Sequence, residues 1–211
     1  MLVKRISLRE NGVRIETDDG KELLLPLDDE RVIQLKHGDE LSSESYDALC
    51  RLSEDHQAYR SALSLLARRD RSVSETALYL ERKGFRTEAK DSAIARLLSK
   101  GYLNDERYGL KLAETLAGKK IAGSDFIRRK LIQKGIKGEV LKSVMASAET
   151  EQPYEKILSM ARKKHISLEG KKNPRDKLIF FLRSRGFGAE IIRRVLKDLD
   201  QNDEFFTDDE S

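Results

Sequence analysis

The sequence predicts a mainly α-helical fold: three tandem three-helix repeats that form an elongated curved array, with a small β-hairpin or meander segment at the N-terminus. Three observations lead to this prediction. A six-residue pattern recurs at a constant spacing, with its glycine at Gly84, Gly135 and Gly186. Apolar residues of helical period surround each copy of the pattern. Two strong hairpin turn signals occur within the first 20 residues.

The N-terminal residues 1–41 are predicted to form the small β-rich segment. Asn11-Gly12 and Asp19-Gly20 are typical of tight hairpin turns, and apolar residues lie on either side of both. These signals predict a three-stranded meander. Because so small a sheet needs a packing partner, we expect a short helix from about Asp29 to Leu35 to cover it.

The recurring pattern is a leucine, two variable residues, a base, a glycine and an apolar residue. It reads Leu80–Phe85, Leu131–Ile136 and Leu182–Phe187. A base in the last turn suits the negative end of the helix dipole, and a glycine after that turn adopts the left-handed conformation that closes a helix. We therefore interpret the pattern as a structural helix end rather than a phosphate-binding loop.

The helix ends divide the remainder of the chain. We expect repeat 1 at residues 42–103 with a long lead-in helix from Ser43 to about Arg69, repeat 2 at residues 104–152 and repeat 3 at residues 153–200. An acidic, disordered tail is expected at residues 201–211.

Local signals refine the helices of each repeat. Ser72-Val73-Ser74-Glu75 predicts a capping box at the start of a second helix, and Pro174 is expected at the first position of another. In the third helix of repeat 1 we expect Leu97 and Leu98 to face inward, and the third helix of repeat 2 should hold the apolar residues Val140, Leu141, Val144 and Met145.

Charge is abundant and segregated. Charged residues make up 37% of the chain and hydrophobic residues 38%. The net charge is −6 over residues 1–57, +15 over residues 58–200 and −5 over residues 201–211. A basic helical body of this kind favours a polyanion or an acidic protein surface as partner.

No catalytic or metal-binding constellation is visible. The single cysteine, Cys50, allows neither an internal disulfide nor a zinc pair, and His37, His56 and His165 lie in no metal-ligand spacing. Asp105-Glu106 is interpreted as acidic residues at a helix start. We predict a protein that is not an enzyme and has no cofactor. The absence of a membrane-length apolar run and of a signal peptide predicts a cytoplasmic protein without a membrane partner.

Several stretches resemble the RecX family of regulatory proteins, which modulate the RecA recombinase. The resemblance covers residues 58–200 well and residues 1–57 loosely. It rests on Leu66–Ser72, on Lys83-Gly84-Phe85, on Gly101–Tyr108 and on Lys134-Gly135-Ile136. The most specific part is Leu-Asn-Asp-Glu-Arg-Tyr within Gly101–Tyr108.

The resemblance implies a function that composition alone does not give. It implies a monomeric protein that binds the RecA–DNA filament in its helical groove and inhibits filament extension, ATPase activity and strand exchange. The implied partners are the RecA filament and single- and double-stranded DNA, bound without sequence specificity. The implied context is DNA repair, homologous recombination and the SOS response.

Basic clusters are the candidates for RecA or DNA contact. Cluster one comprises Arg68, Arg69, Arg71, Arg82, Lys83 and Arg86. Cluster two comprises Lys119, Lys120, Arg128, Arg129 and Lys130. Cluster three comprises Arg162, Lys163, Lys164, Lys171, Lys172, Arg175, Arg183, Arg185, Arg193 and Arg194. Repeat 3 carries the highest net charge of the three repeats, so we expect it to contact phosphates.

Two other functions remain open. The helical units could be helix-turn-helix modules of a DNA-binding protein that acts independently of RecA, with Arg129 and Gln133 as candidates for base readout. The array could also be an interaction scaffold whose partner binding does not depend on DNA. We further hypothesise that the acidic front segment and tail cover part of the basic body and weaken non-specific DNA binding.

Overall fold

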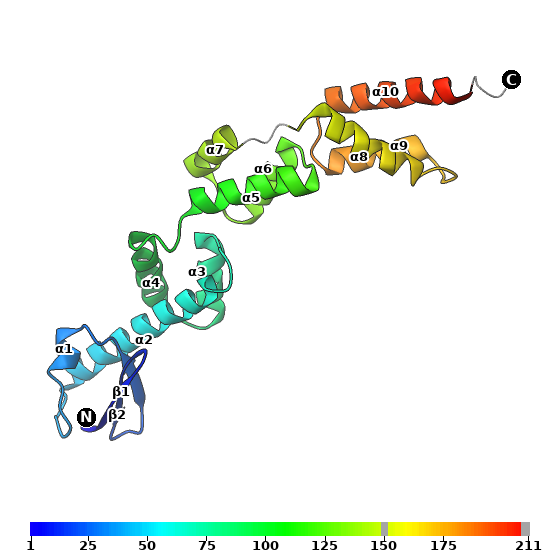
Figure 1. Ribbon diagram of the computed structural model, residues 1–211. Coiled ribbons are helices and arrows are strands. Elements are labelled where there is room, and N and C mark those ends of the chain that lie inside the picture. Colours follow the sequence, from blue (N-terminus) through cyan, green and yellow to red (C-terminus); the bar gives the residue numbers. More distant parts are fainter. Residues whose placement is uncertain (149–151, 208–211) are drawn as a thin grey trace. The chain divides into compact units, whose positions relative to one another are not determined.

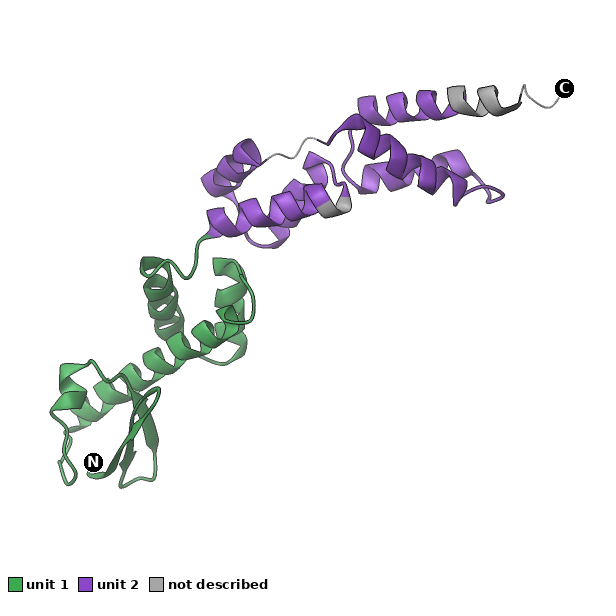
Figure 2. Cartoon of the chain, viewed as in Figure 1, with its two compact units in different colours: residues 1–104 green, residues 105–211 purple. Residues whose placement is uncertain are grey.

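A computed structural model describes residues 1–148 and 152–207, with residues 119, 120 and 201–207 described by their backbone alone. Within that part of the chain it contains ten helices and one three-stranded antiparallel sheet (Figure 1). The predicted class, mainly helical with a small N-terminal sheet, is confirmed. The chain divides into two compact units, Met1–Asn104 and Asp105–Ser211 (Figure 2).

The sheet of the first unit is the predicted meander, in the order β1, β2, β3. Its strands are β1 (Val3–Arg9), β2 (Gly12–Thr17) and β3 (Glu22–Leu25). The short helix α1 (Glu30–Ile33) follows and is shorter than expected. Val3, Ile15 and Leu25 are fully buried and share a core with Leu49 of the next helix, which supplies most of the cover that so small a sheet needs.

The long helix α2 (Ser43–Leu66) supports both halves of the first unit and ends three residues before the expected Arg69. Its N-terminal half packs on the sheet. Its C-terminal half packs on α3 (Val73–Arg82) and α4 (Thr87–Ser99), where Ala58 and Ala62 are fully buried. Small side chains at these positions let the helices approach closely.

The second unit contains two three-helix groups, each with its own hydrophobic core. The first group is α5 (Asp105–Lys120), α6 (Ser124–Gln133) and α7 (Gly138–Ser147). The second is α8 (Tyr154–Ile166), α9 (Pro174–Ser184) and α10 (Ala189–Thr207). Helix α10 continues past residue 200, where the disordered tail is expected, and residues 208–211 lie outside the described part of the chain.

Both expected local signals are present, and the third helices begin at a constant spacing. Ser72 and Glu75 form the capping box of α3. Pro174 occupies the start of α9. The third helices begin at Thr87, Gly138 and Ala189, so the constant spacing of the glycines extends to the start of the following helix.

The recurring pattern closes α3, α6 and α9 in the same way. Each glycine has a left-handed backbone, with φ of 82°, 83° and 81°, and its N–H donates to the carbonyl three residues earlier at 2.9 Å. The next residue donates to the leucine that opens the pattern, at 3.0–3.3 Å, in the bonds Phe85→Leu80, Ile136→Leu131 and Phe187→Leu182. This pair of bonds is a Schellman motif, and it places the leucine and the apolar residue in contact. All three leucines are fully buried.

One inward-facing prediction is wrong, because Leu98 is 44% exposed. Successive helix residues point about 100° apart, so Leu97 and Leu98 cannot both face the core. Among the apolar residues of α7, Leu141 and Val144 are buried and Val140 is 37% exposed.

Gly186 also joins the two groups of the second unit. The N–H of Gly123, just before α6, donates to the carbonyl of Arg185 at 2.8 Å. A Cβ on Gly186 would overlap the backbone of Phe126, and a Cβ on Gly123 would overlap the carbonyl of Gly186. The backbones on either side of this contact therefore lie so close together that a residue larger than glycine would not fit at either position. By contrast, a Cβ on Gly84 would meet nothing within 4 Å.

The pair Gly84→Ala and Gly186→Ala tests this joint. Both substitutions place an L-residue in the left-handed region, which costs about 1–2 kcal/mol. Gly186→Ala must also displace the backbone of Phe126, and we expect a further loss of about 1–3 kcal/mol. Chemical denaturation measures the free energy of unfolding, and hydrogen exchange at the Gly123 amide reports on the joint. Equal losses in the two variants, with an unchanged Gly123 amide, would contradict the proposed role of Gly186.

Candidate nucleic-acid interface

Cluster one lies around α3 and the loop before it, in the first unit. Arg68 and Arg82 are exposed and have no partner among the described residues. Arg69 forms an ion pair with Glu75 at 3.7 Å, and Lys83 lies over the Tyr79 ring at 5.8 Å. The Nε of Arg71 is buried without a hydrogen-bond partner. Arg68 and Arg82 are thus the cluster's most accessible positive charges.

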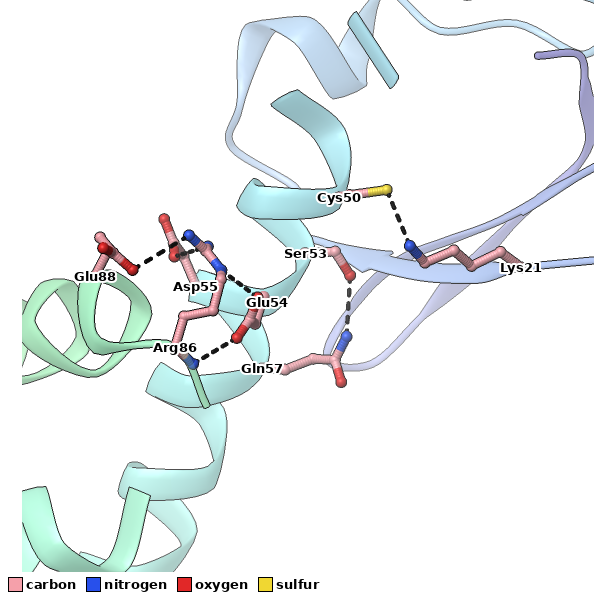
Figure 3. A network of polar contacts seen from close by, with 8 residues as sticks. All are labelled: Lys21, Cys50, Ser53, Glu54, Asp55, Gln57, Arg86 and Glu88. Carbon is pink, nitrogen blue, oxygen red and sulfur yellow. Dashed lines mark hydrogen bonds and ion pairs between the residues drawn. The ribbon is translucent and has the colours of Figure 1, made fainter. Parts of the chain in front are cut away.

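Arg86 does not belong with these accessible residues. Its guanidinium binds Glu54 and Asp55 of α2, the latter at 3.3 Å, and approaches Glu88 at 3.6 Å (Figure 3). Its backbone N–H also donates to Glu54 at 2.7 Å. Arg86 therefore ties the start of α4 to α2. The three carboxylates offset its charge, so Arg86 is a less accessible candidate for contact with a polyanion than Arg68 or Arg82.

The pKa values of this network agree with an ionised cluster. The hydrogen bond that the Arg86 guanidinium donates to Glu54 raises the pKa of Arg86. Partial burial alone would raise the pKa of Glu54, but the hydrogen bonds from Arg86 outweigh it and hold that pKa below its usual value. Burial raises the pKa of Asp55 despite the nearby guanidinium. Glu54 is therefore the main anion paired with Arg86.

Arg86→Gln and Arg82→Gln remove the same charge from neighbouring positions. We expect Arg86→Gln to destabilise the first unit by about 1 kcal/mol, a value reduced by the partial exposure of the ion pair, and to leave DNA affinity almost unchanged. Arg82→Gln should leave stability unchanged and weaken DNA binding. Thermal unfolding and DNA-binding titrations measure the two effects. A larger loss of DNA affinity in Arg86→Gln than in Arg82→Gln would contradict this division.

A polar hollow of about 340 Å³ lies beside cluster one. Its lining includes Arg60 and Arg68 of the region around α2, the hydroxyl-bearing Ser61 and Tyr79, and Asn11 of the β1–β2 turn. The hydroxyls of Ser61 and Tyr79 lie 3.2 Å apart. The lining contains two guanidinium groups and no carboxylate, which suits an anion. Sequence reasoning missed Arg60 because it is a single base within a mixed stretch of α2.

Cluster two is partly engaged in packing. The side chains of Lys119 and Lys120 lie outside the described residues. Arg128 is exposed, whereas Arg129 donates to the carbonyl of Ser184 at 3.5 Å. Lys130 donates to Gln133 at 3.0 Å and lies over the Phe126 ring at 5.5 Å.

Arg129 and Gln133 are the two residues that the helix-turn-helix alternative assigned to base readout. Both have partners within the second unit, Arg129 in repeat 3 and Gln133 on its own helix. Base readout through these side chains would first have to break those contacts.

Cluster three divides into accessible and engaged residues. Five bases are exposed and have no partner among the described residues: Arg162, Lys163, Lys171, Lys172 and Arg183. The others make contacts within the repeat. Arg175 pairs with Asp200 at 3.1 Å, Arg193 donates to Ala189, and Arg194 lies 3.9 Å over the Tyr154 ring. Lys164 and Arg185 lie over the Phe181 ring at 5.4 and 5.0 Å.

Tyr154 anchors the engaged part of repeat 3. Its hydroxyl donates to Asp198 of α10 at 2.7 Å. Burial, together with this hydrogen bond, raises the pKa of Tyr154 to about 12, so the phenol stays neutral. The ring that Arg194 covers is therefore an uncharged packing surface, and Arg194 acts mainly in packing.

The structure also brings together residues that do not belong to one basic cluster of the sequence. A groove of about 720 Å³ runs along α8, the following loop and α9. Its lining includes Lys164, Lys172, Lys177, Phe180 and Phe181. The sequence analysis missed Lys177 because it lies outside the clusters of consecutive basic residues. It missed Phe180 because two adjacent phenylalanines are usually interpreted as core residues.

The described residues offer neither a metal-binding cluster nor a membrane-spanning helix. No group of three His, Cys, Asp or Glu side chains could hold a metal ion within that part of the chain. None of the helices there has an apolar stretch long enough to cross a bilayer.

Comparisons with known proteins place the repeats in a family. A family model described as RecX, first three-helix domain, matches residues 58–97. The regulatory protein RecX of Chlorobium phaeobacteroides is 30% identical over 148 residues, covering 70% of this chain and 96% of that protein. This chain belongs to the RecX family. The regulatory protein RecX of Staphylococcus carnosus is 27% identical over 188 residues, covering 87% of this chain and 69% of that protein.

Solved structures of RecX proteins share the helical repeat fold. The crystal structure of a regulatory protein RecX matches with a TM-score of 0.69 and 20% identity, covering 93% of this chain and 98% of the other. The structure of RecX from Lactobacillus salivarius matches with a TM-score of 0.59 and 22% identity, covering 70% of this chain and 97% of the other. The resemblance found in the sequence is confirmed, and with it a regulatory role.

Proposed function

We propose that this RecX-family protein regulates the RecA recombinase by binding the RecA–DNA filament, where it inhibits filament extension, ATP hydrolysis and strand exchange. The observation that carries this proposal is the recurrence of exposed basic side chains that have no partner among the described residues, in a chain whose relatives are regulatory RecX proteins. Arg68 and Arg82 represent repeat 1, and Arg128 represents repeat 2. Repeat 3 contributes five such side chains, from Arg162 to Arg183.

The proposed binding is additive rather than concentrated in one pocket. A filament presents the same protein surface and the same phosphates at regular intervals. A repeat protein can therefore make several weak contacts at once, each at the high effective concentration set by the others. Because Lys and Arg meet phosphates irrespective of the base, the contacts to DNA carry no sequence information.

Inhibition of ATP hydrolysis is proposed to be indirect, through binding to the filament. The accessible groups are guanidinium and ammonium ions on helix surfaces, which bind and position anions. A protein bound along the filament would restrain RecA protomers or block their addition. Repeat 3 is proposed to supply most of the phosphate contacts, and the other repeats to contribute to RecA binding.

The first test is the ssDNA-dependent ATP hydrolysis of RecA with this protein added below one molecule per RecA protomer. We expect inhibition at substoichiometric ratios, because each bound molecule should act on the filament rather than on one protomer. No inhibition at concentrations where the protein binds DNA would contradict the RecA proposal. It would instead favour a DNA-binding protein that acts independently of RecA.

Charge reversal in repeat 3 identifies the side chains involved. The triple variant Arg162→Glu, Lys163→Glu and Arg183→Glu should weaken inhibition and DNA binding at least tenfold and reduce the dependence of affinity on salt, since each lost phosphate contact lowers the slope by about 0.7–0.9. A matched control makes the same change in net charge at exposed bases outside the three clusters: Lys137, Lys156 and Lys197. Equal effects in the two triple variants would show that net charge alone determines binding.

The acidic tail provides a separate prediction. Residues 201–211 carry five acidic and no basic side chains. Their removal should tighten DNA binding at low salt and have a smaller effect at high salt, because salt screens repulsion between the tail and the phosphates. Titrations of both proteins with one labelled DNA at two salt concentrations measure this. An unchanged affinity and salt slope would rule out a masking role.

A further inference from the structure

The groove of repeat 3 contains an aromatic side chain that folding does not explain. Phe180 is 74% exposed, although full burial of a phenylalanine would contribute about 1.5–3 kcal/mol to stability. Its neighbour Phe181 is partly buried against the core of repeat 3. Because adjacent helix residues point in different directions, α9 cannot bury both rings.

The position of Phe180 faces outward in every repeat. The constant repeat spacing aligns it with Leu78 in α3, which is 46% exposed, and with Arg129 in α6, which is also exposed. Repeat 3 alone of the three repeats has an aromatic ring at this position. That ring adjoins a groove lined by Lys164, Lys172 and Lys177.

The charges around this ring suit a polyanion. Lys164, Lys172 and Lys177 line the groove, and Asp176 is the only carboxylate that does so. Lys172 and Lys177 are exposed and have no partner among the described residues. Leu168 is buried and gives the groove an apolar floor.

We propose that this groove binds single-stranded DNA, with a base stacked on Phe180 and phosphates held by Lys164, Lys172 and Lys177. An exposed aromatic face beside cations is the arrangement by which proteins bind single strands irrespective of sequence. A duplex cannot use it without distortion, because its bases already stack on one another. The proposal rests on the DNA binding proposed above and adds a site and a preference for unpaired strands.

The absence of tryptophan from the sequence allows a direct test. In Phe180→Trp the new indole is the sole tryptophan, so its fluorescence reports contact at this position. We expect oligo(dT) to quench it strongly, and duplex DNA of the same length to quench it much less. Ile166→Trp is the matched control. Ile166 is 64% exposed, is absent from the lining of the groove and follows Lys164 by two residues in α8, which corresponds to a rotation of about 200° around the helix. The fluorescence of the control variant should change little.

Phe180→Leu tests the energetic contribution and keeps an apolar side chain at the exposed position. Stacking contributes about 1–3 kcal/mol per base, so we expect a loss of about tenfold in affinity for oligo(dT) with little change for duplex DNA. The unfolding midpoint should stay the same. Affinity is measured independently by the anisotropy of labelled DNA.

The outcomes separate this proposal from the wider one. Suppose that the protein binds oligo(dT) and inhibits RecA, but the indole of Phe180→Trp is not quenched and Phe180→Leu binds normally. The groove proposal is then wrong and the proposed function stands. Equal quenching by polyglutamate would also overturn it, since an acidic peptide would then be an equally good occupant. If the wild-type protein binds no DNA, both the groove and the DNA contacts of the proposed function fail.

Discussion

The Schellman closure at Gly84, Gly135 and Gly186 is the constraint on which the repeats depend. Each closure ends a helix and buries a leucine, at 80, 131 or 182. Each also turns the chain so that the next helix starts three residues after the glycine, at 87, 138 and 189. The closure occupies the backbone groups that a helix end would otherwise leave without partners. Each group of three helices buries its own core, and charged side chains occupy the outer helix faces.

In the second unit the closure at Gly186 also joins the two three-helix groups. Gly186 both ends α9 and receives the backbone of Phe126, while Gly123 donates to the carbonyl beside it. In the first unit a Cβ on Gly84 would meet nothing within 4 Å, and α4 is held to α2 by a shared hydrophobic core together with the ion pairs of Arg86. The same local motif therefore occurs beside two kinds of packing, one with a backbone-to-backbone joint and one without it. Basic residues that serve in packing, such as Arg86, Arg129 and Arg194, are not equivalent to those that remain accessible.

The sequence predicted features that arise from local physics. The helix ends, the capping box at Ser72 and the start of α9 at Pro174 depend on neighbouring residues alone. It could not predict contacts between distant elements. Arg86 resembles its basic neighbours, and only the approach of α2 places Glu54 beside it. The exposure of Leu98 and Phe180 depends on how α4 and α9 are rotated about their axes, which paired apolar residues leave ambiguous. Lys177 is a candidate only because it lines the groove of repeat 3, which the sequence does not reveal.

The proposed function requires the protein to recognise RecA and DNA together in the filament. The most direct measurement compares its affinity for a RecA–ssDNA filament, formed with a non-hydrolysable nucleotide, with its affinity for the same naked strand at the same salt concentration. The proposed additivity of weak contacts predicts tighter binding to the filament, and less sensitivity to salt because part of the interface is protein. An affinity for naked DNA that equals or exceeds the affinity for the filament would contradict the claim.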